Sequence, residues 1–317
     1  MAAAARLAQR ARPLARPNPG VAALVVHEGR VIARGWTQAG GRPHAEAIAL
    51  AGLAPQVLAQ ATMYVTLEPC AHVSPRGPAC ADLMLTARPA RVVIGQLDPD
   101  PRTAGEGIAR LKAAGIETRL LDDPASAASL AGFLTRQRAG RPWVTLKLAT
   151  SLDGCIALAD GTSQWITGET ARAHVHAQRA RNDAILVGGG TWRADSPRLD
   201  VRLPGLEARS PDRVVLTRGA APAAGVTAIP SPQAIASLDG VLHLYVEGGA
   251  ETAAAFLAAD LVNELHLYTA PILIGDGRRS LGALGLANLA DAHGRWHVHE
   301  RRQLGSDQFT AYLRTRD

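Results

Sequence analysis

His44-Ala-Glu46, Thr66-Leu-Glu-Pro-Cys70 and Cys80 make up the stretch of this sequence that says most about its fold and chemistry. Two thiolates and one imidazole are donors that suit zinc. Three protein ligands leave the fourth tetrahedral position open, which is typical of a catalytic zinc rather than a structural one. We therefore predict a zinc site whose ligands are His44, Cys70 and Cys80.

Glu46 follows His44 by two residues and is better placed beside a metal-bound water, moving protons, than as a fourth ligand. A His-x-Glu motif followed by Pro-Cys-x-x-Cys is typical of zinc deaminases that act on nucleobases. Here nine residues, rather than two, separate Cys70 from Cys80. The alternative interpretation is a surface histidine and two small core cysteines. It is weaker, because the remaining cysteine, Cys155, has no such neighbours.

The composition limits the classes of protein to consider. A chain of 317 residues with 47% hydrophobic residues suits two domains with cores of their own. Three cysteines do not make a disulfide framework, so we expect a reducing, cytoplasmic setting. The net charge of +6 suits nucleic acid or phosphorylated small molecules, but no run of like charges favours nucleic acid. No apolar run reaches transmembrane length, so we expect no membrane partner.

Strand and helix patterns alternate in the first part of the chain. Apolar β-branched runs predict a hairpin from residues 21–26 and 31–36, and strands at 62–67, 91–96 and 116–121. Helices are predicted at 44–53, 80–86, 105–114 and 124–138, after a first amphipathic helix within residues 1–12. Ala139-Gly-Arg-Pro142 is the best linker candidate. We therefore expect an α/β layered domain at 1–140 and a second domain at 141–317.

The second part has a different pattern. Strands are predicted at 143–149, 184–187, 213–217, 242–246, 264–269, 295–301 and 308–313, with helices at 169–181 and 251–259. Gly188-Gly-Gly-Thr191 and Glu247-Gly-Gly249 follow strands. Gly249 opens a helix whose amides would suit a pyrophosphate, although a Gly-Gly turn alone is a weak signal. Residues 219–237 are rich in Ala and Pro, and we expect a surface excursion there.

Several motifs, in order along almost the whole chain, carry a resemblance to one family. The first part has Pro17-Asn-Pro19, His44-Ala-Glu46, Thr66-Leu-Glu-Pro-Cys70 and Asp98-Pro-Asp-Pro101. The second has Ser151-Leu-Asp-Gly154, Gly161-Thr-Ser-Gln-Trp-Ile-Thr167, Asp195-Ser-Pro197 and Val246-Glu-Gly-Gly249. The chain resembles the bifunctional riboflavin-biosynthesis deaminase/reductases of the RibD or RibG family. Each motif alone is a weak signal, but the order of all these motifs along the chain is highly specific to this family.

The resemblance implies a fold and a pair of reactions. It implies a cytidine-deaminase-like first domain and a dihydrofolate-reductase-like second domain that uses NADPH. The implied substrate is a small phosphorylated pyrimidine, 2,5-diamino-6-ribosylamino-4(3H)-pyrimidinone 5′-phosphate. Its deamination, with Glu46 as the proton carrier, precedes reduction of the ribosyl chain to ribityl. A homo-oligomer is compatible with the sequence.

The family positions also imply contacts in each domain. Asn18 matches a substrate contact of the deaminase. In the reductase the substrate positions are Ser163, Arg179, Leu199, Arg202 and Glu247. The cofactor positions are Ala149, Trp165, Thr191, Asp195, Gly249, Ala250, Glu251 and Thr252. Arg179 and Arg202 suit phosphate because guanidinium groups form paired hydrogen bonds with its oxygens.

Lys147 is one of only two lysines and lies mid-strand, where a charge is costly unless it is paired. A lysine of an edge strand reaching for solvent is the alternative. We expect a catalytic role for Lys147 and Asp195, with Lys147 near Asp195 or Glu247.

Three departures from the family pattern affect loops rather than ligands. Ala22 stands where glycine is usual, and Asp100 where asparagine is usual. The loop from Cys70 to Cys80 is one residue longer than usual. Loss of one activity is therefore one rival hypothesis. The others are a nucleic-acid deaminase with an unrelated second domain, which leaves the motifs after Lys147 unexplained, and a structural zinc module fused to a binding domain.

Overall fold

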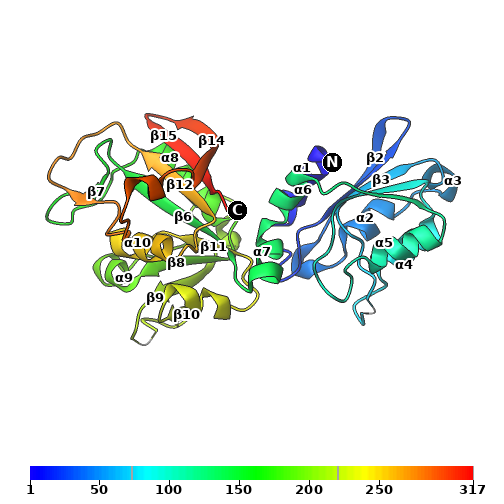
Figure 1. Cartoon of the computed structure of the whole chain (residues 1–317), viewed down its shortest axis with the longest axis horizontal. Coiled ribbons are helices and arrows are strands. Elements are labelled where there is room, and N and C mark those ends of the chain that lie inside the picture. The colour runs from blue at the N-terminus through cyan, green and yellow to red at the C-terminus, as the bar shows by residue number, and fades with distance from the viewer. Residues whose placement is uncertain (73, 220, 317) are drawn as a thin grey trace. The chain divides into compact units, whose positions relative to one another are not determined.

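The computed structural model describes residues 1–72, 74–219 and 221–316 (Figure 1). The chain divides into two compact units, Met1–Gly140 and Arg141–Asp317. Helix α7 (Ala131–Ala139) ends at Gly140, which has a φ of 66°. Glycine adopts this left-handed conformation without a steric penalty and commonly ends helices. The first unit therefore ends at the position where the sequence places a linker.

A five-stranded sheet forms the centre of the first unit, in the order β2-β1-β3-β4-β5. Its strands are β1 (Ala22–His27), β2 (Arg30–Trp36), β3 (Thr62–Leu67), β4 (Arg91–Gln96) and β5 (Glu117–Leu120). Strand β1 runs antiparallel to β2 and β3, and β3, β4 and β5 are parallel. The predicted hairpin is confirmed, with Glu28 and Gly29 at positive φ in its two-residue turn.

Helices cover both faces of this sheet (Figure 1). Helices α1 (Ala2–Ala8) and α6 (Pro124–Ser129) lie on one face. Helices α2 (Ala45–Leu50), α4 (Cys80–Ala87) and α5 (Glu106–Ala113) lie on the other. A Cβ on Gly35 of β2 would lie 2.0 Å from the Ala45 carbonyl oxygen. The backbone of α2 therefore packs directly on the sheet, which fixes the position of His44.

Two features of the first unit differ from the prediction. The helix expected over 124–138 is two helices, α6 and α7, which meet at Leu130. The amide and the hydroxyl group of Ser126 both donate to the Asp123 carboxylate. Ser129 Oγ donates to the Ser126 carbonyl oxygen at 2.8 Å. Such short polar side chains compete with helical hydrogen bonds. A short helix, α3 (Pro55–Leu58), was not predicted.

An eight-stranded sheet forms the second unit, in the order β10-β9-β8-β11-β6-β12-β15-β14. The strands from β10 to β12 in this order are parallel: β6 (Trp143–Thr150), β8 (Ala184–Gly188), β9 (Asp212–Leu216), β10 (Val226–Ile229), β11 (His243–Val246) and β12 (Glu264–Thr269). Strands β14 (Trp296–Leu304) and β15 (Asp307–Arg314) add an antiparallel edge. Strands β7 (Cys155–Ala157) and β13 (Arg278–Arg279) form a separate pair.

Side chains of the large sheet alternate between two cores. Leu186 and Leu244 pack into one core with Phe256 of α10 (Ala250–Ala258). Ile185 and Tyr245 pack into the other with helix α8 (Glu169–Arg179). Both faces of the parallel strands are thus covered, which favours polar groups at the ends of these strands and in the loops after them.

Two features of the second unit differ from the prediction. The glycine run after β8 opens a helix that was not predicted, α9 (Gly189–Asp195). Residues 219–237 are not only a surface excursion, since β10 pairs in parallel with β9 and the short helix η4 (Pro232–Ser237) follows. Val226 and Ile229 are buried, so a strand of four residues suffices to extend the sheet. No helix in the described residues is both long and apolar enough to cross a bilayer.

Candidate active sites

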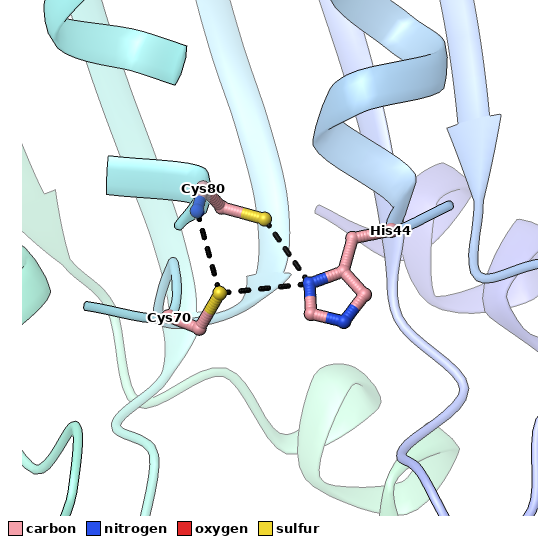
Figure 2. Close-up of side chains that lie close together, drawn as sticks. All are labelled: His44, Cys70 and Cys80. Carbon is pink, nitrogen blue, oxygen red and sulfur yellow. Dashed lines mark hydrogen bonds between the residues drawn. The ribbon is translucent and has the colours of Figure 1, made fainter. Parts of the chain in front are cut away.

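The predicted metal ligands meet where α2, α4 and the end of β3 come together (Figure 2). His44 is the N-cap residue of α2, Cys70 follows β3, and Cys80 begins α4. The His44 Nδ1 atom lies 3.2 Å from Cys80 Sγ and 3.6 Å from Cys70 Sγ. All three donor atoms lie within 4.8 Å of one another.

This geometry fits zinc. Bond lengths of about 2.3 Å to sulfur and 2.0 Å to nitrogen place tetrahedral donors roughly 3.5–3.8 Å apart. The His44 distances are close to that range, and all three atoms face one point in Figure 2. Both cysteines are buried. The backbone amide of Cys80 donates to Cys70 Sγ at 3.3 Å, which favours a thiolate there.

Glu46 lies in the first turn of α2 and is only 3% exposed. Burial raises the pKa of its carboxyl group. The nearby His44 and a hydrogen bond with Cys80 both lower this pKa but do not cancel the effect of burial. The Cys80 hydrogen bond lowers the pKa of the Cys70 thiol to about 4, against the effect of burial. A buried carboxyl group beside a metal site, with a raised pKa, is suited to hold and release a proton near neutral pH.

Glu68 has a role that the sequence analysis missed. Its carboxylate is 2% exposed and accepts hydrogen bonds from three backbone amides, those of Asp98, Gly105 and Ile108, at 3.0–3.2 Å. The carboxylate thereby fixes the loop before α5 against the segment that carries Cys70. Its position directly before Pro69-Cys70 was the only sequence signal, since its partners lie 30–40 residues away.

The structure accommodates two of the three departures from the family pattern. Ala22 is fully buried at the start of β1, and its amide donates to Thr66 Oγ1 at 3.1 Å. Asp100 accepts hydrogen bonds from Arg102 Nε at 3.0 and 3.1 Å, so the added carboxylate has its own partner. These contacts, with Arg102 and Thr66, keep both substitutions compatible with the local fold.

Asn18 approaches the loop that leads to His44. A Cβ on Gly41 would lie 2.0 Å from Asn18 Nδ2, and Gly41 has a φ of 83°. Only glycine fits this position without strain or a clash. Asn18 is therefore packed beside the segment that precedes a metal ligand, as a substrate contact of the deaminase would need.

The second polar centre lies on one face of the large sheet, beneath α8. Glu247 follows β11, and its carboxylate accepts hydrogen bonds from Arg179 Nε at 2.6 Å and Nη2 at 2.9 Å. Lys147 Nζ of β6 lies 4.0 Å from Glu247 Oε2. Burial lowers the pKa of Lys147, and Glu247 only partly offsets this. The mid-strand lysine is thus paired with Glu247, one of its two expected partners.

Arg179 links this centre to the segment after α9. Its Nη1 donates to the Asp200 carbonyl oxygen at 2.9 Å. Leu199 is 3% exposed and has a φ of 56°, an uncommon conformation for a leucine. The Arg202 amide donates to His176 Nδ1 at 3.3 Å, and its side chain lines a surface cavity with Arg198 and Ser210.

His176 is a second residue that the sequence analysis missed. It lies on α8 three residues before Arg179, so the two share one helix face. Burial lowers its pKa, and Arg179 and Arg202 lower it further. Its helical spacing from Arg179 was the only sequence signal, and that spacing alone does not show that the histidine meets Arg202.

The glycines after β8 and β11 form one close-packed unit. A Cβ on Gly188 would lie 2.2 Å from Thr252 Oγ1, and one on Gly248 would lie 2.5 Å from Thr252 Cβ. A Cβ on Gly249 would lie 3.5 Å from Thr191 Oγ1. Thr191 and Gly249 therefore meet at the N-terminus of α10, where exposed amides suit a pyrophosphate. Thr252 is largely buried against the glycines.

The other predicted cofactor contacts, and the predicted substrate contact Ser163, lie in several elements of the second unit. Ala149 lies in β6 beside Tyr268 of β12. Trp165 and Ser163 lie in the loop between β7 and α8. Asp195 is the exposed last residue of α9, and no contact joins it to Lys147 among the described residues. Ala250 and Glu251 form the first turn of α10.

Comparison with protein families agrees with this division. The model of the cytidine and deoxycytidylate deaminase zinc-binding region matches residues 1–96, and that of the RibD C-terminal domain matches residues 142–308. The chain is 37% identical to the riboflavin biosynthesis protein RibD of Escherichia coli over 97% of this chain and 96% of that protein. It is 39% identical to RibD of Mycobacterium tuberculosis, over 92% of this chain and 89% of that protein.

The chain belongs to the RibD family. It is accordingly a bifunctional riboflavin biosynthesis enzyme with a deaminase and a reductase domain. The family predicted from the motifs, the two-part α/β fold and the enzyme class are confirmed.

Solved structures match over the full length. Form 1 of RibD from Acinetobacter baumannii has a TM-score of 0.87 at 32% identity, covering 99% of both chains. A Thermotoga maritima protein has a TM-score of 0.86 at 29% identity, covering 99% of this chain and 97% of that one. That protein is described as a diaminohydroxyphosphoribosylaminopyrimidine deaminase/5-amino-6-(5-phosphoribosylamino)uracil reductase.

Proposed function

We propose that the first unit removes the 2-amino group of 2,5-diamino-6-ribosylamino-4(3H)-pyrimidinone 5′-phosphate with the help of one zinc ion. The observation that carries this proposal is the convergence of His44, Cys70 and Cys80 beside buried Glu46. When bound, zinc lowers the pKa of a water molecule so that it can attack near neutral pH.

Glu46 does the proton transfers in this proposal. Its carboxylate takes a proton from the attacking water and delivers it to a ring nitrogen. It then moves the second proton, that of the added hydroxyl group, to the amine, which leaves as ammonia while a carbonyl group forms. Water adds at the ring carbon as ammonia leaves, so the reaction is hydrolytic and needs no oxidant. Asn18, beside Gly41, holds the pyrimidine by side-chain hydrogen bonds.

We propose that the second unit uses NADPH to reduce the ring-opened imine form of the ribosyl chain. The product is 5-amino-6-(5-phospho-D-ribitylamino)uracil. The cofactor supplies hydride. Gly249, Ala250, Glu251 and Thr252 at the start of α10, with Thr191, hold its pyrophosphate. Ala149, Trp165 and Asp195 contact the remainder of the cofactor.

Lys147 and Glu247 handle the proton that accompanies the hydride. Their pairing at 4.0 Å and the lowered pKa of Lys147 suit a proton donor in a partly buried site. Arg179 holds Glu247 in place, and Arg202 takes the phosphate in the cavity that it lines. Ser163 and Leu199 complete the substrate contacts.

The proposal is tested by giving the diaminopyrimidine substrate to zinc-loaded protein with and without NADPH and identifying products by mass. Without NADPH the product should have exchanged an amino group for a carbonyl oxygen. With NADPH it should also have gained two hydrogens. Absence of both changes with metal-loaded, folded protein would refute the proposal. Reduction without prior deamination would refute the order of the two steps.

A further inference from the structure

Trp165 is unusually exposed for a tryptophan. Its relative exposure is 62%, and it lies in the loop between β7 and α8. Leaving so large an apolar ring in water is unfavourable, and tryptophan is highly buried on average. An exposed tryptophan whose position is fixed by specific contacts is therefore suited to stack on a planar ligand.

Arg172 makes two contacts with this loop. Its guanidinium carbon lies 4.7 Å from the centroid of the Trp165 ring, a cation–π arrangement. Its Nη1 donates a hydrogen bond to the Thr167 carbonyl oxygen at 2.6 Å. Arg172 lies near the start of α8, so it joins the ring and the loop backbone to a rigid element.

The end of the loop has a second anchor. Asp307 of β15 is 1% exposed, and its Oδ2 accepts a hydrogen bond from the Gly168 amide at 2.6 Å. This carboxylate satisfies an amide at the N-terminus of α8, where negative charge is favourable. The base of the loop is thus fixed by Asp307, and the orientation of the Trp165 ring depends on Arg172.

We propose that Arg172 is a positioning residue that presents one face of Trp165 to the nicotinamide ring of NADPH. The inference rests on the proposed reductase function, in which Trp165 contacts the cofactor. Arg172 covers part of the indole ring, and the exposed remainder is the surface on which the planar nicotinamide stacks. Arg172 touches neither cofactor nor substrate and acts through Trp165 and the Thr167 carbonyl.

Removing the guanidinium frees the Trp165 ring and the loop segment at Thr167, so binding of NADPH then includes the entropy cost of ordering them. One cation–π contact and one hydrogen bond together correspond to about five- to twentyfold in affinity. We expect Arg172→Met to raise the Kd for NADPH by roughly that factor in calorimetric titration of the full chain. Arg172→Lys keeps the charge but not the planar group, so its effect should be smaller, about two- to fourfold.

Arg301→Met is the matched control, because Arg301 is an exposed arginine on β14 of the same unit. It should leave the Kd for NADPH unchanged. In steady-state kinetics Arg172→Met should raise KM for NADPH while kcat and KM for the pyrimidine change little. A general loss of folding would instead lower the active fraction and reduce kcat.

A double-mutant cycle with Trp165→Leu gives the sharpest test. If Arg172 acts through Trp165, adding Arg172→Met to Trp165→Leu should raise the Kd by no more than about twofold. An equal effect of Arg172→Met in both backgrounds would overturn the proposal, as would an unchanged Kd in the single variant. If the wild-type chain itself binds no NADPH, the proposed reductase function fails and this inference fails with it.

Discussion

Glu46 combines deep burial, a raised pKa and a position beside the metal ligands. We predict that Glu46→Gln abolishes deamination, lowering kcat by about 10²–10⁴-fold, because an amide of the same shape cannot carry a proton. Elemental analysis should show zinc retained, and NADPH-dependent reduction of deaminated substrate should persist. Deamination near the wild-type rate would remove Glu46 from the proton path.

His174 of α8 offers a test of pH dependence outside the active sites. Its Nδ1 lies 2.9 Å from the Tyr268 hydroxyl, and its ring packs edge-on to Phe309. Burial lowers its pKa to about 4, with His266 and Arg302 adding to the shift and Glu300 opposing it. The folded chain therefore holds His174 neutral at pH values where the unfolded chain protonates it.

The sign of the effect follows from that depressed pKa. The stability contributed by neutral His174 is present above the unfolded pKa of about 6.5 and is lost as pH falls towards 4. Between pH 7 and pH 5 the free energy of unfolding falls by about 1–2 kcal/mol because of this residue. His174→Gln keeps a polar partner for Tyr268 but does not titrate. Denaturant unfolding should show a smaller fall in stability for the variant. An equal fall in both proteins would contradict the assignment.

The three proposed zinc ligands could be predicted, because donor type and motif order single them out without knowledge of the fold, and the structure brings their donor atoms together. Glu68 and His176 were not, because their partners are brought close only by folding. Glu68 binds amides 30–40 residues away, and His176 accepts a hydrogen bond from the Arg202 amide, 26 residues away. Lys147 was an intermediate case. The cost of a mid-strand charge predicted that it had a partner, and the register of β6 against β11 determined which one.

The junction of β8, α9 and α10 depends on the absence of side chains. We predict that Gly188→Ala destabilises the second unit by about 1–3 kcal/mol, because the new Cβ would lie 2.2 Å from Thr252 Oγ1. Gly190→Ala, at the second residue of α9, is the control. Nothing lies within 4 Å of its Cβ, so alanine should stabilise the helix by about 0.5–1 kcal/mol.

Thermal or denaturant unfolding of both variants measures these effects. Equal changes in the free energy of unfolding of the two variants would show that close packing at Gly188 does not make alanine unfavourable there. The same junction holds a helix, α9, that the sequence analysis did not predict. Glycines disfavour a helix, but Gly188 is required by its contact with Thr252, and the chain continues as a helix from Gly189.

Strands with a strong apolar pattern were predicted well, whereas strand β10 and helix α3 were not predicted. Strands β3 and β4 were predicted to the residue, since each is an apolar run flanked by turn or proline signals. Strand β10 has only four residues, and its ordering depends on pairing with β9. Such elements owe their structure to a neighbour and carry little signal of their own.

Each half of the chain has its own sheet, core and set of polar groups. We predict that residues 141–317 expressed alone fold without zinc, bind NADPH and reduce the deaminated intermediate, because that unit contains Lys147, Glu247 and the glycine-lined start of α10. Circular dichroism establishes folding, and calorimetry measures NADPH binding. A folded fragment that neither binds nor reduces would show that the halves are not independent.

The central claim, that one chain carries two separable activities, is tested most directly by mixing two singly inactivated proteins. Glu46→Gln should leave the diaminopyrimidine unchanged, and Lys147→Met should accumulate the deaminated, unreduced intermediate. Mixed in equal amounts with zinc, NADPH and substrate, they should form the ribityl product, because the intermediate made by one protein is reduced by the other. The mass spectrum of the mixture is the measurement. Absence of the ribityl product from the mixture, or its formation by either variant alone, would contradict the account.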